Sequence, residues 1–403
     1  MNAPNTAIRG QNLQPYIGLA LSGGGARAMA FHLGCMRALR DRGILTNVRV
    51  ISSVSGGSVL TACYAYQDED FETFDRAVVE LLKRGIQGSI VRHAFLSFQL
   101  PKILGTVLIT GLGSMLLGAV SFTLSRLRRY LGAPTRSIEQ WISSASQSLP
   151  IWGSLTTAFE CALAKELFGD KTVADVSRPG LEVMINACDL RTGTAFRFGS
   201  KRSFGWRYGE VIGDPPSLAK AVAASAAFPI LLPPLVEAFE FDRKGTRSRQ
   251  VLALTDGGVF DNLGVTVLEP GRSHDITLTH PVTHIISLNA GAGQFEGLDT
   301  PFWWIGRVKR SFEAVYRKAQ DAMYSRLHKY VETGELDGFG MVYLGQQDDK
   351  LPWSPPDLVP RDAVKDYPTD FAPISEKDLG LLTSRGEQLT GIIVDRYLAD
   401  LMT

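Results

Sequence analysis

The sequence has no excess of either charge, few cysteines and a single long uncharged run. Its 42 Lys and Arg residues nearly equal its 41 Asp and Glu residues, so the net charge is about +1 over 403 residues. A chain without a positive field has no general attraction for nucleic acid, and we expect no nucleic-acid partner. The four cysteines are far apart, lie in apolar stretches and form no C-x-x-C pair: Cys35, Cys63, Cys161 and Cys188. This pattern predicts neither a disulfide framework nor a metal site.

The start of the chain lacks the features of a signal peptide. Its only early apolar run, 16–21, is short and leads into glycines, with no segment that resembles a cleavage site. Together with the scattered cysteines, this favours a cytoplasmic protein. Repeats and low-complexity tracts are also missing, and with 45% hydrophobic residues the chain can bury a substantial core.

The first fifty residues alternate between strand and helix patterns. An apolar run at 16–21 precedes glycines and a helical pattern over 26–42, and a second run at 48–53 precedes another helical pattern. This order is typical of a βαβ unit, so we expect an α/β fold. Further strands are predicted at 181–187, 251–254 and 284–288. Two helices complete the prediction: a core-facing amphipathic helix over 305–331 and a last helix capped by Ser375 with Asp378.

A serine follows the second predicted strand in a turn that only small residues flank. Within SSVSGGS at 52–58, Ser55 has Ser53 two positions before it and Gly57 two positions after it. Such flanks are the steric requirement of a nucleophile elbow, because its strained turn excludes larger side chains. Neither Ser53 nor Ser58 meets this requirement, since Ile51 precedes the first and Leu60 follows the second at that spacing.

Three glycines open the first predicted helix. Gly23, Gly24 and Gly25 lead into it, so several backbone N–H groups there have no helical partner and point along the positive end of the helix dipole. This arrangement suits an oxyanion. The same spacing also fits a dinucleotide-binding loop, but that motif requires an acidic residue at the end of the second strand, where Ser53 and Ser55 occur instead. No Gly-Lys-Ser/Thr follows, which excludes a Walker loop.

An aspartate with two glycines behind it follows the strand predicted at 251–254. Asp256, Gly257 and Gly258 form either an ordinary turn or a carboxylate held open to a site. Histidine does not accompany these motifs, apart from His32 in the first helix, which is expected to be a core residue.

In order and spacing, these motifs and the stretch ASAAFP at 224–229 resemble the patatin-like phospholipases over about residues 16 to 290. The resemblance implies a Ser-Asp dyad with Ser55 as nucleophile and Asp256 as base. It also implies an oxyanion hole at Gly23, Gly24 and Gly25, with no cofactor or metal required. The chain departs from the family pattern at Ser53, where a glycine is usual, and at Ala28, which also replaces a glycine.

Other features of the family follow as expectations. The fold would be a three-layer α/β/α sandwich with a mostly parallel central sheet and a hydrophobic helical insertion. The catalytic domain would span 1–300 with the insertion at about 86–130, and a mainly helical extension, 301–403, would pack on it. Ser53, Gly57, Gly257 and Gly258 would shape the turns, and Arg27 would either support the glycine loop or contact a phospholipid head group.

The uncharged run is Ile103 to Leu124, which is long enough to cross the roughly 30 Å apolar core of a bilayer. Ser55 and Asp256 must lie on one side of any membrane, however, and no second run of this length provides a return crossing. We therefore predict a re-entrant or in-plane membrane element whose trailing arginines contact anionic head groups; a buried hairpin or an oligomer contact is the alternative. Those arginines are Arg126, Arg128 and Arg129.

The predicted activity is hydrolysis of lipid acyl esters of the phospholipase A or lysophospholipase type, with membrane lipids as partners. Acyl transfer and thioester hydrolysis use the same dyad and stay open as alternatives. So does a membrane-associated scaffold that keeps the fold without turnover. The sequence leaves the oligomeric state open.

Overall fold

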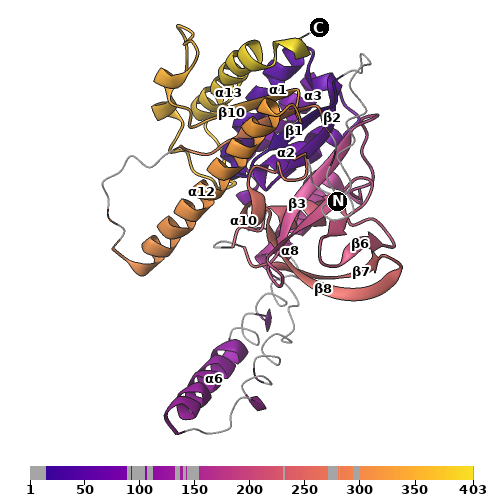
Figure 1. The fold of residues 1–403 in the computed structure, drawn as a ribbon, viewed down its shortest axis with the longest axis vertical. Helices are drawn as coiled ribbons and strands as arrows, with labels where there is room; N and C mark the ends of the chain where they lie inside the picture. The colour runs from indigo at the N-terminus through magenta and orange to yellow at the C-terminus, as the bar shows by residue number, and fades with distance from the viewer. Residues whose placement is uncertain are drawn as a thin grey trace.

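The computed structural model describes the following residues: 15–88, 92, 105–106, 112–131, 137–138, 142, 154–229, 232–270, 280, 282–293, 300 and 302–402. Within them a ten-stranded sheet has the order β10-β9-β1-β2-β3-β4-β5-β6-β7-β8. Figure 1 shows the sheet with helices against it and two helices, α6 and α12, that extend from the body. The predicted α/β class with a large sheet flanked by helices is confirmed.

One half of the sheet is parallel. Each of its strands pairs in parallel with its neighbours, as the βαβ order predicts. These strands are β1 (Ile17–Leu21), β2 (Val48–Ser53), β3 (Glu182–Asp189), β9 (His284–Asn289) and β10 (Gly338–Tyr343). The carboxyl ends of such strands share one edge, where ligands of open α/β sheets bind.

The other half is antiparallel, so the sheet as a whole is mixed. Its strands are β4 (Thr194–Gly199), β5 (Phe204–Gly205), β6 (Gly209–Ile212), β7 (Leu235–Arg243) and β8 (Thr246–Asp256). β7 and β8 form a long hairpin whose two turn residues, Lys244 and Gly245, both have positive φ, as its two-residue connection requires. The end of β8 returns to pair with β3, where Ala187 is opposite Asp256. This extra pairing carries Asp256 to the edge where β2 and β3 end.

Alternate residues of the parallel strands face two separate cores. Leu19 and Leu21 of β1 belong to the larger cluster, and Ala20 belongs to the smaller one. Helices α1, α2, α3 and α13 contribute to the larger cluster, whereas α12 contributes Met323 and Leu327 to the smaller. The sheet is thus covered on both faces.

The helices divide into long covering helices and short connecting turns. The α-helices are α1 (Gly25–Asp41), α2 (Gly56–Ala65), α3 (Phe71–Arg84), α6 (Leu112–Leu131), α8 (Leu155–Leu163), α9 (Leu218–Ser225), α10 (Gly258–Asp261), α12 (Trp304–Glu332) and α13 (Glu376–Tyr397). A π-helical turn, η3 (Ala164–Phe168), follows α8, and the 3-10 turns are η1 (Leu45–Asn47), η4 (Asp348–Lys350), η5 (Arg361–Ala363) and η6 (Ala399–Leu401).

The C-terminal hundred residues contribute to the same sheet and core. β10 pairs with β9 at one edge, and α13 packs along α1. Ser375 caps α13 as predicted, since its hydroxyl accepts the Asp378 N–H at 3.1 Å. Where one domain ends and an extension begins, proposed from the sequence at residue 300, remains a prediction.

The helix predicted over 305–331 is α12, but the prediction that it faces the core along its length is wrong. Met323 and Leu327 are buried, whereas Val308 and Val315 are 62% and 70% exposed. The apolar period was therefore identified correctly, and what covers it was not. The C-terminal half of the helix has a protein partner within the described chain, and the N-terminal half extends beyond it (Figure 1).

Only part of the uncharged run Ile103 to Leu124 lies among the described residues. Its second half falls in α6, on which Leu116 and Phe122 are exposed. In the portion of the chain that the structure describes, no helix is both long and apolar enough to cross a bilayer. The predicted in-plane element stays a prediction.

Candidate active site

Ser55 occupies a tight turn between β2 and α2. Its backbone has φ 53° and ψ −121°, a conformation that side chains other than glycine rarely adopt. Gly57 explains the need for small neighbours, because a Cβ there would lie 2.6 Å from the Leu21 carbonyl oxygen. The turn lifts Ser55 above the ends of the central strands, which is the geometry predicted for a nucleophile elbow.

Ser53, where the family pattern has glycine, is buried at the end of β2. Its hydroxyl donates to the Met184 carbonyl at 3.4 Å and accepts from the Ser58 hydroxyl at 3.2 Å. The extra oxygen is therefore accommodated by hydrogen bonds, and the turn at Ser55 keeps its shape.

Asp256 is the last residue of β8, and its side chain reaches Ser55. A hydrogen bond joins the two side chains, and the Asp256 Oδ1 also accepts the Gly258 N–H at 2.7 Å. The backbone of Asp256 is held as well, because its N–H donates to the Ala227 carbonyl at 3.0 Å. The structure thus brings together the two residues that the sequence predicts as a pair.

Burial dominates the electrostatics of Asp256. Loss of water raises the pKa of this carboxyl to about 6, although the bonds from Gly258 and Ser55 act in the opposite direction. A carboxylate with this pKa is ionised at neutral pH yet basic enough to take up a proton during a reaction. His32, the histidine nearest to the motifs in sequence, is fully buried in α1, and burial lowers its pKa to about 3. It remains a neutral core residue.

The glycine loop lies directly against Ser55. A Cβ on Gly23 would be 3.2 Å from the Cβ of Ser55, and Gly24 and Gly25 both have positive φ, at 142° and 57°. The Gly23 N–H already donates to the Asn262 carbonyl at 3.1 Å, which differs from its predicted place in the oxyanion hole. For the Gly24 and Gly25 amides, the described residues provide no acceptor. Gly24 and Gly25 are therefore the loop donors that can meet an oxyanion.

Arg27 extends away from Ser55. Its guanidinium is buried and donates to the Tyr367 carbonyl at 2.9 Å and to the Lys365 carbonyl at 3.5 Å. The same C-terminal loop accepts the Ala26 N–H through the Asp370 carbonyl at 2.7 Å. Of the two roles predicted for Arg27, these bonds favour support of the glycine loop.

A polar network beneath the elbow was not identified from the sequence. The Ser225 hydroxyl accepts the Ser55 N–H at 3.0 Å and donates to the Asn186 carbonyl at 2.6 Å. The Asn186 side chain in turn donates to the Ser53 carbonyl at 3.0 Å. A buried asparagine inside an apolar strand pattern was the available signal. These bonds tie β2, β3 and the turn after α9 together, so they fix the direction of the Ser55 backbone.

Groups of three or more potential metal-binding side chains are not found among the residues with described positions. The chemistry that the arrangement can perform is therefore argued from the serine, the carboxylate and the backbone amides: attack by a hydroxyl, transfer of its proton and stabilisation of an oxyanion.

Comparisons with known proteins agree with this geometry. The family model described as "Patatin-like phospholipase" matches residues 19–268. A 61-residue stretch, 15% of this chain, is 48% identical to Lysophospholipase NTE1 of Mycosarcoma maydis and spans 3% of that protein.

Solved structures show the same fold at low identity. Human GIVD cytosolic phospholipase A2 has a TM-score of 0.50 at 14% identity, over 97% of this chain and 60% of that one. VipD from Legionella pneumophila has a TM-score of 0.41 at 14% identity, over 95% of this chain and 67% of that one. The chain thus spans less than two thirds of the human enzyme and a small part of the fungal one. Because the family model covers well over half of the chain, the protein belongs to the patatin-like phospholipase family.

Proposed function

We propose that this protein hydrolyses acyl esters of lipids, of the phospholipase A or lysophospholipase type, through a dyad of Ser55 and Asp256. The hydrogen bond between a serine in a strained turn and a buried carboxylate with a pKa near 6 is the observation that carries the proposal. Family membership supports the substrate class.

In the first step the Ser55 oxygen attacks the ester carbonyl while Asp256 takes up the hydroxyl proton. Negative charge develops on the carbonyl oxygen, and the amides of Gly24 and Gly25 donate to it at the positive end of α1. The carbon–oxygen bond to the leaving alcohol then breaks. Asp256 gives its proton to that alcohol, and the acyl group remains on Ser55.

In the second step water hydrolyses the acyl-enzyme. Asp256 takes a proton from the water as it attacks the same carbonyl carbon, and the Ser55 oxygen leaves with that proton. The fatty acid is released and the dyad is restored. Acyl transfer to a lipid alcohol would follow the same route with the alcohol in place of water.

Labelling with a fluorophosphonate serine probe tests the nucleophile. We expect the wild-type protein to be labelled at Ser55, with the site located by peptide mass spectrometry, and Ser55→Ala to lose both labelling and fatty-acid release from phospholipid vesicles. The matched control is Ser325→Ala, since Ser325 is an exposed serine on α12 whose hydroxyl bonds only its own helix through the Asp321 carbonyl. Labelling of Ser55→Ala at the wild-type rate would refute the assignment. A wild type that is neither labelled nor active with vesicles would favour the scaffold alternative.

A further inference from the structure

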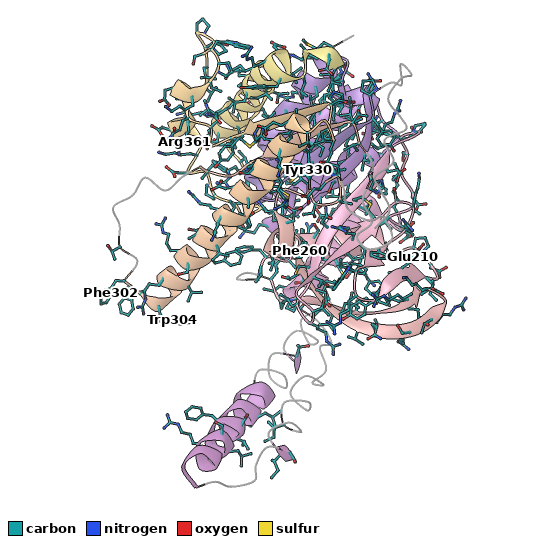
Figure 2. All side chains as sticks on the ribbon, in the orientation of Figure 1. Glu210, Phe260, Phe302, Trp304, Tyr330 and Arg361 are labelled. Atoms are coloured by element: carbon teal, nitrogen blue, oxygen red, sulfur yellow. The ribbon has the colours of Figure 1, made fainter. Side chains whose placement is uncertain are left out.

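The start of α12 exposes three consecutive aromatic side chains. Phe302, Trp303 and Trp304 are 83%, 76% and 65% exposed, and Figure 2 shows Phe302 and Trp304 at the free end of the helix, away from the body. Large aromatic groups gathered in this way are unusual on a protein that meets only water, and they mark sites of interaction. Trp in particular is favoured at the boundary between water and lipid.

An apolar stripe continues from these residues along the helix. Trp304, Val308, Phe312 and Val315 follow each other at intervals of four, four and three residues, so they share one face. All four are exposed. The stripe extends beyond the protein core and has the form of an interfacial helix.

Basic residues flank the stripe. Over residues 304–318 the helix has five basic residues and one acidic residue, Glu313. The basic residues are Arg307, Lys309, Arg310, Arg317 and Lys318. Arg307 also lines a surface hollow of about 460 Å³ together with the three aromatic residues and Thr300. Positive charge beside exposed tryptophan complements anionic head groups above an apolar layer.

The same helix reaches the candidate active site at its middle. Phe312 stacks on Tyr316 with ring centroids 6.0 Å apart, and Tyr316 is close enough to Asp256 for the carboxylate to raise the pKa of its hydroxyl, after burial as the main cause. Two turns further on, the Tyr324 hydroxyl accepts from the Asn289 side chain at 2.9 Å, at the end of β9. The exposed stripe therefore leads from the free end of α12 to the edge of the sheet where Ser55 lies.

A second protruding element has the same chemistry. On α6, Leu116, Val120 and Phe122 are exposed, and the Arg126 guanidinium lies 5.0 Å from the centre of the Phe122 ring. The segment Leu112–Leu131 contains no acidic residue. Figure 1 shows α6 and the N-terminal end of α12 both extending outward in the lower half of the view.

We propose that Phe302, Trp303, Trp304 and the exposed stripe of α12 dock the protein on an anionic phospholipid surface, with α6 as a second contact. In this arrangement the aromatic residues enter the interface, Arg307 contacts lipid phosphate, and a lipid moves along Phe312 and Tyr316 to Ser55. The last step rests on the proposed hydrolase function; the docking itself does not.

Cosedimentation of the full-length protein with vesicles tests the docking. We expect the wild type to bind vesicles of phosphatidylcholine with phosphatidylglycerol, and the double variant Trp303→Ser/Trp304→Ser to bind at least about tenfold more weakly, since loss of two interfacial anchors removes more than 1.4 kcal/mol. The matched control is Trp206→Ser/Trp353→Ser, because those tryptophans are also exposed but lie on other elements. Its vesicle binding should equal that of the wild type.

A water-soluble short-chain ester separates docking from catalysis. The double variant should hydrolyse it within about twofold of the wild-type rate while losing most activity on vesicles, because surface changes away from the site leave the fold intact. Ser55→Ala should show the reverse, with vesicle binding kept and both activities lost. Vesicle binding without lipid hydrolysis in the wild type would support the docking and refute the proposed function.

Two results would overturn the docking. One is equal vesicle binding by the double variant and the wild type. The other is a wild-type dimer that the double substitution converts to monomer, with no binding of vesicles by either, because the face would then join two copies of the chain. Sedimentation velocity distinguishes this case from the proposal.

Discussion

The catalytic centre and the free end of α12 violate the burial preferences of side chains in opposite ways. At the centre a carboxylate, Asp256, is buried with Ser55 and backbone amides as its partners. At the free end, Trp303 and Trp304 are exposed to solvent. Both arrangements oppose folding, because a buried charge loses hydration and exposed aromatic surface gains nothing from the hydrophobic effect.

The difference between the two regions indicates what each is for. A buried carboxylate with a raised pKa favours proton transfer, and an exposed aromatic cluster favours a partner that can cover it. Replacing either group should remove a cost to stability and at the same time remove a function. The predictions below test this exchange from the largest expected effect to the smallest.

Asp256→Asn should have the largest effect. An amide cannot accept the Ser55 proton, so we expect kcat/KM for a soluble ester to fall by about 10²–10⁴-fold. At neutral pH the variant should also be more stable than the wild type by about 1 to 3 kcal/mol, because a pKa raised from 3.8 to about 6 means that the native state disfavours the ionised form. Urea denaturation at pH 7.5 measures the gain. A variant that is both less active and less stable would indicate a structural role for the carboxyl.

The pH dependence of the wild type should show the same group. Asp256 must be ionised to act as a base, so kcat/KM should fall about tenfold per pH unit below about 6. Stability changes in the other direction. Because the folded pKa lies above the unfolded one, the stabilising contribution of the protonated carboxyl is complete below about pH 4 and is lost as the pH rises through 6.

Denaturation of wild type and Asp256→Asn across this range tests the linkage. The difference in unfolding free energy between them should be small at pH 4 and should reach its full value above pH 7. A difference that does not change with pH would show that the carboxyl titrates elsewhere, and an activity profile that stays flat to pH 4 would exclude Asp256 as the base.

Sequence patterns were sufficient for the site and insufficient for its supports. Ser55 and Asp256 each follow a strand within a short glycine motif, and local spacing determines where such residues emerge from a sheet. The bond from Arg27 to Tyr367 spans 340 positions, and no local pattern contains that information. The Gly23 amide was assigned to the oxyanion hole for the same reason, since its partner Asn262 lies far along the chain.

The antiparallel half of the sheet shows a related limit. Alternating patterns predicted strands, and the βαβ order correctly predicted the parallel half. The pairing of β8 with β3 depends on how a long hairpin returns to the sheet, which periodicity alone does not determine. For α12, the apolar period gave the helix and its face, whereas its surroundings change from core to solvent halfway along.

The smallest expected effect lies on the exposed stripe of α12. Val315→Ala should change the free energy of unfolding by less than about 0.5 kcal/mol, because this side chain gives up little buried surface. Leu327→Ala, on the same helix but fully buried, is the matched control and should cost about 2–5 kcal/mol through the cavity that it leaves. Urea denaturation of the two variants without lipid measures both values. If Val315→Ala were as costly as Leu327→Ala, a protein partner, either another part of this chain or a second copy, would already cover the stripe, and the surface that we assign to lipid would not be free to bind it.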